Sequence, residues 1–271
     1  MADDSSISDD PGTILDSYDS VLKRLPLPPP AARSVVVVEE VLYKSPYRWT
    51  APRILICNDD SLEEGEMVHV RSDRIMLGRT KGEIVIGHDV AMSGSHAEIV
   101  RKDAGGQHAW VLRDLGSSNG TLVRARAVTL KPGITVLLGS KRYRFEQPGV
   151  SQNPAGDGEE PGTSLLGDLA SVPTDCLPAL VETATPGGPT PARHPFKATR
   201  VRIGRPGQGN DIEIDDLCLA GTHAVVTRDY SGVWQLEAQP SLNGVWVKVD
   251  MIKLIDNCLF QCGEQRFRFL V

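Results

Sequence analysis

The chain repeats itself once along its 271 residues, and this repeat limits the folds open to it more than any other feature. Short motifs recur in the same order at a nearly constant spacing of 124 to 127 residues. The matching pairs are Gly78-Arg79 with Gly204-Arg205, Ser95-His96-Ala97 with Thr222-His223-Ala224, Trp110 with Trp234, Asn119-Gly120 with Asn243-Gly244, and Arg142 to Phe145 with Arg266 to Phe269. Such a colinear series predicts two copies of one structural unit.

The two copies extend upstream of these motifs, because Ile54-Leu55 lies as far before Gly78 as Leu180-Val181 lies before Gly204. We therefore place the first domain at 53–147 and the second at 178–271. Residues 1–33 are acidic and then proline-rich, which is typical of a disordered tail. Residues 148–177 combine Pro, Gly and Ser and indicate a linker. Residues 34–52 are an uncertain lead-in, since Val35 to Val38 could add a strand or belong to the tail.

Within each copy, short segments rich in β-branched and aromatic residues alternate with turn signals. Such segments in the first copy are 74–77, 83–86, 96–100, 110–112 and 142–145, and the turn signals fall at 105–106, 118–120 and 132–133. No stretch of ten residues shows clean helical periodicity. Many short strands at close spacing predict an all-β fold, with an antiparallel β-sandwich in each copy and loops gathered at its ends.

Charge and hydropathy favour a protein without nucleic-acid or membrane partners. The formal net charge is −6, and the first twenty residues hold six aspartates and no Lys or Arg, so the rest is close to neutral. Bulk attraction to nucleic acid or anionic lipid is therefore not expected. No apolar run approaches the roughly 20 residues that span a bilayer. The start of the chain lacks the pattern of a signal peptide, and we expect a cytoplasmic protein.

The sequence shows no clear motif for an enzyme active site, a cofactor site or a metal site. Its five cysteines, at 57, 176, 218, 258 and 262, are odd in number and form no zinc-type pairs, so we expect them to be reduced and buried. Cys258 and Cys262 are spaced to share one face of a strand. The loop with Gly204, Gly207 and Gly209 lacks the Lys-Ser/Thr of a phosphate-binding P-loop. Paired acids such as Asp59-Asp60 are typical of turns.

Three motifs of the first copy, taken together, resemble the signature of the forkhead-associated (FHA) domain family. They are Gly78-Arg79, the segment from Met92 to Ala97, and the segment from Asp114 to Thr121. The family pattern is Gly-Arg, Ser-x-x-His, and then Ser/Thr-x-Asn-Gly-Thr. The resemblance implies a β-sandwich that binds phosphothreonine peptides in its end loops. The tandem arrangement resembles a group of bacterial FHA signalling proteins.

The resemblance implies that Arg79, Ser93, Ser118 and Asn119 bind the phosphopeptide. A guanidinium fork suits bidentate contact with a phosphate, and a serine hydroxyl can donate to a phosphate oxygen. The Asn119 amide both donates and accepts, which suits peptide backbone. Arg79, Ser93 and Asn119 also have plainer interpretations: a surface arginine after a turn glycine, a serine that starts a strand, and an Asn-Gly hairpin turn.

Gly78, His96 and Gly120 would support this site, with His96 as a buried histidine that braces the loop behind Ser93. Gly94 departs from the family, whose members commonly carry Arg, Lys or Asn at this position. This absence could weaken affinity or change peptide preference.

The second copy keeps the scaffold of the motif and loses part of its chemistry. Arg205 and Asn243 persist, whereas Ala220 replaces the site serine and Leu242 stands where Ser118 does. Glu237 also replaces Arg113. We expect a degenerate site that does not bind phosphate.

The sequence therefore predicts a non-enzymatic signalling adaptor that reads phosphothreonine through its first domain, downstream of a Ser/Thr kinase. The second domain would be a packing or docking module. The alternative is a phosphate-independent interaction scaffold on the same fold. A third possibility concerns Thr13, which is followed three residues later by Asp16 and could, once phosphorylated, occupy the chain's own site.

Overall fold

The computed structural model describes residues 51–104, 107–148, 172–184 and 190–271. Its described part contains twenty strands and a 3-10 helix at Thr174–Cys176, which confirms the all-β prediction. No helix in the described ranges is long and apolar enough to cross a membrane. The tail at 1–33, with Thr13, lies outside the described residues, as do most of 34–52 and residues 149–171 of the expected linker.

The twenty strands form two series of ten that match the two sequence repeats. The first series is β1 (Arg53–Cys57), β2 (Gly65–His69), β3 (Arg74–Gly78), β4 (Ile84–Val85), β5 (Ala97–Ala104), β6 (Gln107–Asp114), β7 (Thr121–Ala125), β8 (Ala127–Leu130), β9 (Thr135–Leu138) and β10 (Lys141–Glu146). The second is β11 (Ala179–Glu182), β12 (Arg193–Pro195), β13 (Arg200–Gly204), β14 (Ile212–Glu213), β15 (Thr222–Arg228), β16 (Trp234–Ala238), β17 (Val245–Val249), β18 (Met251–Leu254), β19 (Cys258–Cys262) and β20 (Gln265–Leu270). Strands β1 and β11 open the two series at the upstream positions where the repeat begins in the sequence.

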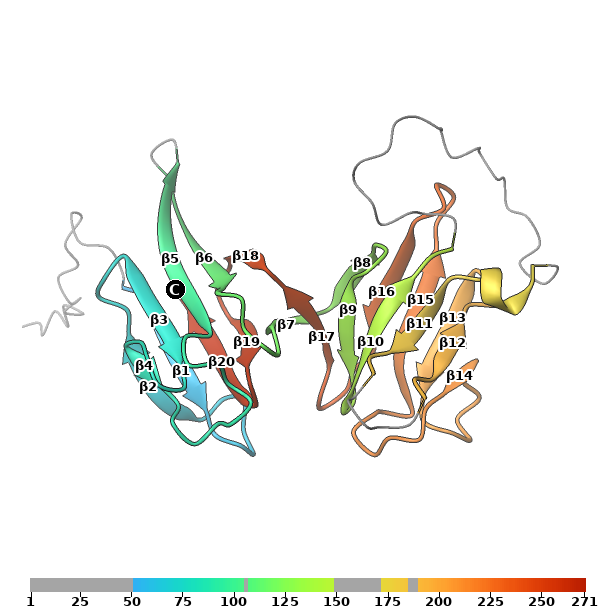
Figure 1. Cartoon of the computed structure of the whole chain (residues 1–271), viewed down its shortest axis with the longest axis horizontal. Coiled ribbons are helices and arrows are strands. Elements are labelled where there is room, and N and C mark those ends of the chain that lie inside the picture. The colour runs from blue at the N-terminus through green and yellow to red at the C-terminus, as the bar shows by residue number, and fades with distance from the viewer. Residues whose placement is uncertain (1–50, 105–106, 149–171, 185–189) are drawn as a thin grey trace, which may run out of the picture. The chain divides into compact units, whose positions relative to one another are not determined.

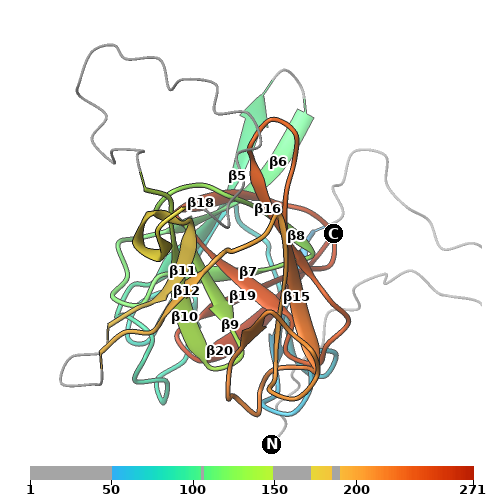
Figure 2. The same cartoon turned by 90° about the vertical axis from the view of Figure 1, so that its right-hand side faces the viewer.

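Each β-sandwich takes its last strands from the other repeat. What we call the first sandwich combines β1 to β6 with β18, β19 and β20: β1 pairs with β20 and β6 with β18. The second sandwich combines β11 to β16 with β8, β9 and β10: β11 pairs with β10 and β16 with β8. Figure 1 shows the red strands β18 to β20 among blue and green ones, and Figure 2 shows β10 beside β11 and β12.

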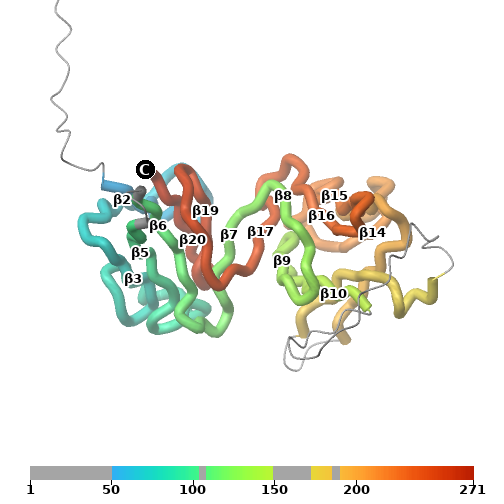
Figure 3. The backbone as a smooth tube through the Cα atoms, turned by 90° about the horizontal axis from the view of Figure 1, so that it is seen from above, coloured from blue at the N-terminus to red at the C-terminus, as the bar shows by residue number. Residues whose placement is uncertain are grey.

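The exchange takes place where β7 and β17 run antiparallel to one another, with Thr121 opposite Val249 and Ala125 opposite Val245. Figure 3 shows β7 leading into β8, with β17 alongside it. A tight reversal here would need a two-residue turn with positive φ, which favours Asn-Gly or Asp-Gly. The residues that join β7 to β8 and β17 to β18 are Arg126 and Asp250, and neither has a positive φ. The chain therefore continues straight into the other sandwich.

Each hydrophobic core is accordingly made of side chains from both repeats. The first core contains Ile54, Leu77 and Ile99 of the first repeat together with Phe260, Phe267 and Phe269 of the second. The rings of Phe260 and Phe267 stack with their centroids 5.1 Å apart. The second core contains Tyr143 and Phe145 of the first repeat, and Phe145 stacks on Phe196 at 5.9 Å. Alternate residues of β10 and β20 face these cores, as the period of a strand requires.

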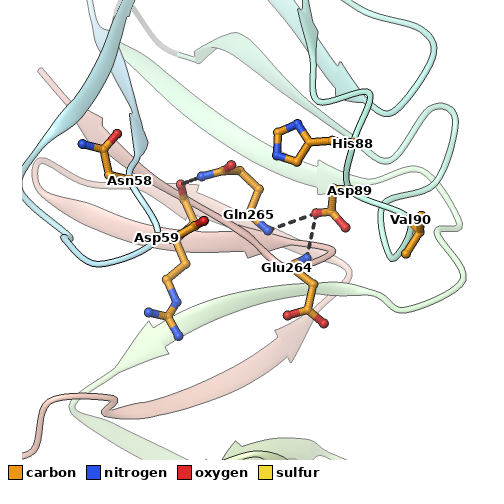
Figure 4. A pocket seen from close by; sticks show the side chains of 8 residues that line it. Asn58, Asp59, His88, Asp89, Val90, Glu264 and Gln265 are labelled. Atoms are coloured by element: carbon orange, nitrogen blue, oxygen red, sulfur yellow. Dashed lines mark hydrogen bonds between the residues drawn. The ribbon is translucent and has the colours of Figure 1, made fainter.

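Two buried aspartates hold the exchanged strands in place. Asp89 accepts hydrogen bonds from the backbone N–H groups of Glu264 and Gln265, at 2.8 and 3.0 Å, in the turn between β19 and β20 (Figure 4). Asp216 accepts hydrogen bonds from the Ser140 N–H and hydroxyl, at 2.7 and 2.8 Å, in the turn between β9 and β10. An aspartate of each repeat is therefore hydrogen-bonded to a turn of the other repeat. The segments 53–147 and 178–271 mark the repeats in sequence, but neither segment contains one complete sandwich.

The cysteines only partly follow expectation. Cys57 and Cys262 are buried and Cys258 is half-buried, and Cys258 and Cys262 both pack on the first core, as the strand spacing predicted. The prediction of burial is wrong for Cys176 and Cys218, which are exposed because they lie in a 3-10 helix and a loop rather than in a strand.

Candidate functional site

Hydrogen bonds join three loops at one end of the first sandwich: the loop after β3, the loop between β4 and β5, and the loop between β6 and β7. The N–H of Arg79 donates to the Ser93 carbonyl at 2.9 Å. The N–H of Ser118 donates to Ser93 Oγ at 3.0 Å, and Asn119 Nδ2 donates to the Ala91 carbonyl at 2.8 Å. The structure therefore brings together Arg79, Ser93, Ser118 and Asn119, which come from separate parts of the sequence.

These contacts leave hydrogen-bonding groups available to a ligand. The guanidinium of half-buried Arg79 makes one long contact among the described residues, 3.4 Å from Nη1 to the Val90 carbonyl. Ser93 Oγ acts as an acceptor, so its own hydrogen is free to be donated. Asn119 keeps its amide oxygen and a second N–H. An anion at this place would meet a guanidinium fork and a hydroxyl donor, which is a suitable environment for phosphate.

His96 braces two of the three loops from inside the sandwich. It is fully buried, its Nδ1 accepts the N–H of Ser93 at 3.1 Å, and its Nε2 lies 3.3 Å from the Gly120 carbonyl. These partners define a neutral ring with the proton on Nε2. Burial lowers the pKa of His96, against weaker opposing effects of the Gly120 carbonyl and of Asp114 and Asp89.

This geometry predicts that acid weakens the fold. The pKa values of His96, His194 and His223 are all lowered, first of all by burial. Below about pH 6.5, the ordinary value of histidine, the unfolded chain then binds more protons than the folded one, so the free energy of unfolding falls. Urea midpoints measured between pH 7.5 and 5 should decrease. A His96→Gln variant should show a smaller decrease over the same range, and an equal decrease would contradict a role for His96.

Two glycines allow the loops to approach so closely. A Cβ on Gly78 would lie 2.2 Å from the Gly94 carbonyl oxygen, and Gly120 has a φ of 75°. Neither position accommodates a larger residue without displacement of the loops. This agrees with the supporting role expected for Gly78 and Gly120.

The second sandwich repeats the loop arrangement with different chemistry. His223 Nδ1 accepts the N–H of Ala220 at 3.1 Å, and Nε2 lies 2.9 Å from the Gly244 carbonyl. Asn243 Nδ2 donates to the Cys218 carbonyl at 2.9 Å. Ala220 thus takes the place of Ser93 and offers no hydroxyl. Arg205 is exposed, and the side chain of Leu242 is 87% exposed where Ser118 stands in the first sandwich.

Sequence reasoning missed two cations that the exchange brings to the first site. Arg142 Nη1 donates to the Asn119 carbonyl at 2.7 Å. Lys248, which belongs to the second repeat, lies so close to Gly120 that a Cβ there would be 2.3 Å from Lys248 Cε. No local pattern marks either residue, because each is far from the motif in sequence. The signal that could have indicated them is the absence of an Asn-Gly or Asp-Gly turn around Arg126 and Asp250, where β7 meets β8 and β17 meets β18.

A cavity of about 470 Å³ lies beside the loop that connects Asp89 to the site (Figure 4). Residues of both repeats line it: Asn58, Asp59, His88, Asp89, Val90, Glu264, Gln265 and Arg266. The groups facing it carry both charges, so it has no clear preference for an anion or a cation.

The fold and the loops together define a tandem β-sandwich protein with one anion-compatible loop cluster and one altered copy of it. The family model for the FHA domain matches residues 75–139 and 201–263. Both repeats therefore match the FHA family, and the resemblance noted in the sequence is confirmed. No curated relative matches the chain.

Three solved structures show local likeness to the chain. One comes from a structural and functional analysis of phosphothreonine-dependent FHA domain interactions, with 11% identity, 82% of this chain and 97% of that chain covered, and a TM-score of 0.30. The FHA domain of the CT664 protein from Chlamydia trachomatis has 25% identity, coverage of 34% and 93%, and a TM-score of 0.23. Mycobacterium tuberculosis EmbR in complex with a low-affinity phosphopeptide has 26% identity, coverage of 35% and 24%, and a TM-score of 0.22.

Proposed function

We propose that this chain is a non-enzymatic signalling adaptor that binds phosphothreonine peptides through the loops of the first sandwich. The observation that carries the proposal is the placement of Arg79 and Ser93: the loops hold them together, and their guanidinium and hydroxyl donors are largely unused. The FHA match adds support, since the resemblance to that family implies that these loop residues bind a phosphopeptide.

The chemistry suits a phosphorylated side chain better than an acidic one. A phosphate carries nearly two negative charges at neutral pH and three strong acceptor oxygens. Arg79 can meet two of these oxygens through its planar fork, and Ser93 can donate to the third. The Asn119 amide oxygen then remains for the peptide backbone. The ligand would be a protein phosphorylated by a Ser/Thr kinase. Thr13, outside the described residues, is a candidate internal ligand on its sequence alone.

The second sandwich is proposed to act without phosphate, as a packing or docking module. Its loops are held in the same way, but Ala220 has no hydroxyl and exposed Leu242 adds apolar surface beside Asn243. Leu217 is also exposed, at 89%. It lies next to Cys218, whose carbonyl accepts the hydrogen bond from Asn243. Such apolar surface disfavours a doubly charged ligand and favours a protein contact.

Titration of the full-length chain with a degenerate phosphothreonine peptide library tests the proposal. We expect saturable binding that disappears when the peptides are treated with phosphatase. The matching unphosphorylated library is the control. Binding that is equal with and without phosphate would instead support the phosphate-independent scaffold.

A further inference from the structure

Lys248 belongs to the second repeat, but its side chain lies against the Asn119-Gly120 turn of the first. It stands opposite Leu122 in the pairing of β17 with β7. Its stem crosses Gly120, where a Cβ would be 2.3 Å from Cε and 2.9 Å from Cδ. Because Gly120 precedes Leu122 by two residues, the side chain leans along β7 toward the loop. The ammonium group is thereby carried toward the candidate site.

Arg124 is the residue of the first repeat that corresponds to Lys248, and its contacts show which groups a cation at this position can reach. Arg124 crosses Gly244 in the same way, and its Nη2 donates to the carbonyls of Ser241 and Leu242 at 3.1 and 3.3 Å. The Arg124 guanidinium is therefore engaged with the loop of the second repeat that precedes β17. Lys248 is exposed and makes no hydrogen bond or ion pair with the part of the chain that the structure describes. Its charge is available to a ligand.

We propose that Lys248 is a specificity-determining residue, which makes the first sandwich prefer phosphothreonine peptides with a Glu or Asp side chain near the phosphothreonine. This inference rests on the proposed function. A peptide that places its phosphate between Arg79 and Ser93 and its backbone at Asn119 passes the turn on which Lys248 lies. The residue after Ser93 is Gly94, which supplies no cation. Arg142, bonded to the Asn119 carbonyl, adds positive potential at the same turn.

The test uses three phosphothreonine peptides that differ only in their flanking positions, which carry Glu, Gln or Lys. An exposed ion pair is weak, so we expect the parent chain to bind the Glu peptide about two- to fivefold more tightly than the Gln peptide. Lys248→Met keeps the stem that packs on Gly120 and removes the charge. In this variant the Glu and Gln peptides should bind equally, because the charge that distinguishes them has been removed.

Charge reversal and a matched control make the test specific. Lys248→Glu should prefer the Lys peptide over the Gln peptide. Lys253→Met, which removes an exposed lysine of β18 in the same sandwich, should retain the parent preference. A preference that persists in Lys248→Met overturns the inference and leaves phosphate binding intact. Failure of all three peptides to bind the parent chain in a phosphate-dependent way overturns the proposed function, and the inference with it.

Discussion

Phe267→Ala should destabilise the first sandwich, although Phe267 lies in the second repeat of the sequence. The ring is fully buried in the first core and stacks on Phe260. Truncation of a buried phenylalanine costs about 3–5 kcal/mol, a large part of the roughly 5–15 kcal/mol that holds a domain together. Phe145→Ala is the matched variant, because Phe145 is equally buried in the second core and lies in the first repeat.

Amide hydrogen exchange, measured separately for each strand, distinguishes the two variants. Phe267→Ala should accelerate exchange in β5, and Phe145→Ala should accelerate exchange in β15. Phosphopeptide affinity should fall in Phe267→Ala and be retained in Phe145→Ala. In the opposite pattern, Phe267→Ala would accelerate hydrogen exchange in β15 and Phe145→Ala in β5. That result would contradict the swap of strands between the two repeats.

Local sequence patterns predict the strands well because each strand depends on neighbouring residues, whereas the candidate site is inferred from three separate motifs that resemble the FHA signature. The alternation that buries Phe267 and Phe269 is visible in β20 itself, and the motif around His96 marks the loops. The resemblance to the FHA signature implies that His96 braces the loop behind Ser93, and in the structure the Ser93 N–H donates to His96 Nδ1 at 3.1 Å.

The exchange could not be predicted in the same way, since it depends on which of two similar partners a segment chooses. Tyr143-Arg144-Phe145 and Phe267-Arg268-Phe269 have the same pattern, so either segment fits the alternation that each sandwich needs. The contacts that hold the exchanged strands do not distinguish the partners either, since Asp89 bonds the turn at Glu264 and Gln265 as Asp216 bonds the turn at Ser140. Arg142 and Lys248 reach the site only as a consequence of that choice.

Arg79→Ala should weaken phosphopeptide binding by roughly ten- to several hundred-fold, with little change in stability. A hydrogen bond to a charged group contributes about 1.5–3 kcal/mol, and a bidentate contact lies toward the upper end of this range. The fold should tolerate the change, because the Arg79 side chain makes one long contact within the described residues. Ser93→Ala removes a single neutral donor and should cost on the order of tenfold.

Arg205→Ala is the control for this measurement, since Arg205 occupies the same position in the second sandwich. Beside Ala220 and Leu242 it lacks the hydroxyl partner that Arg79 has in Ser93, so its loss should leave the affinity for a phosphothreonine peptide unchanged. Isothermal titration of both variants, with urea midpoints to verify folding, separates the two sites. Equal binding by Arg79→Ala and the parent chain would show that the phosphate lies elsewhere. A loss in Arg205→Ala would show that the second sandwich binds phosphate despite its missing hydroxyls.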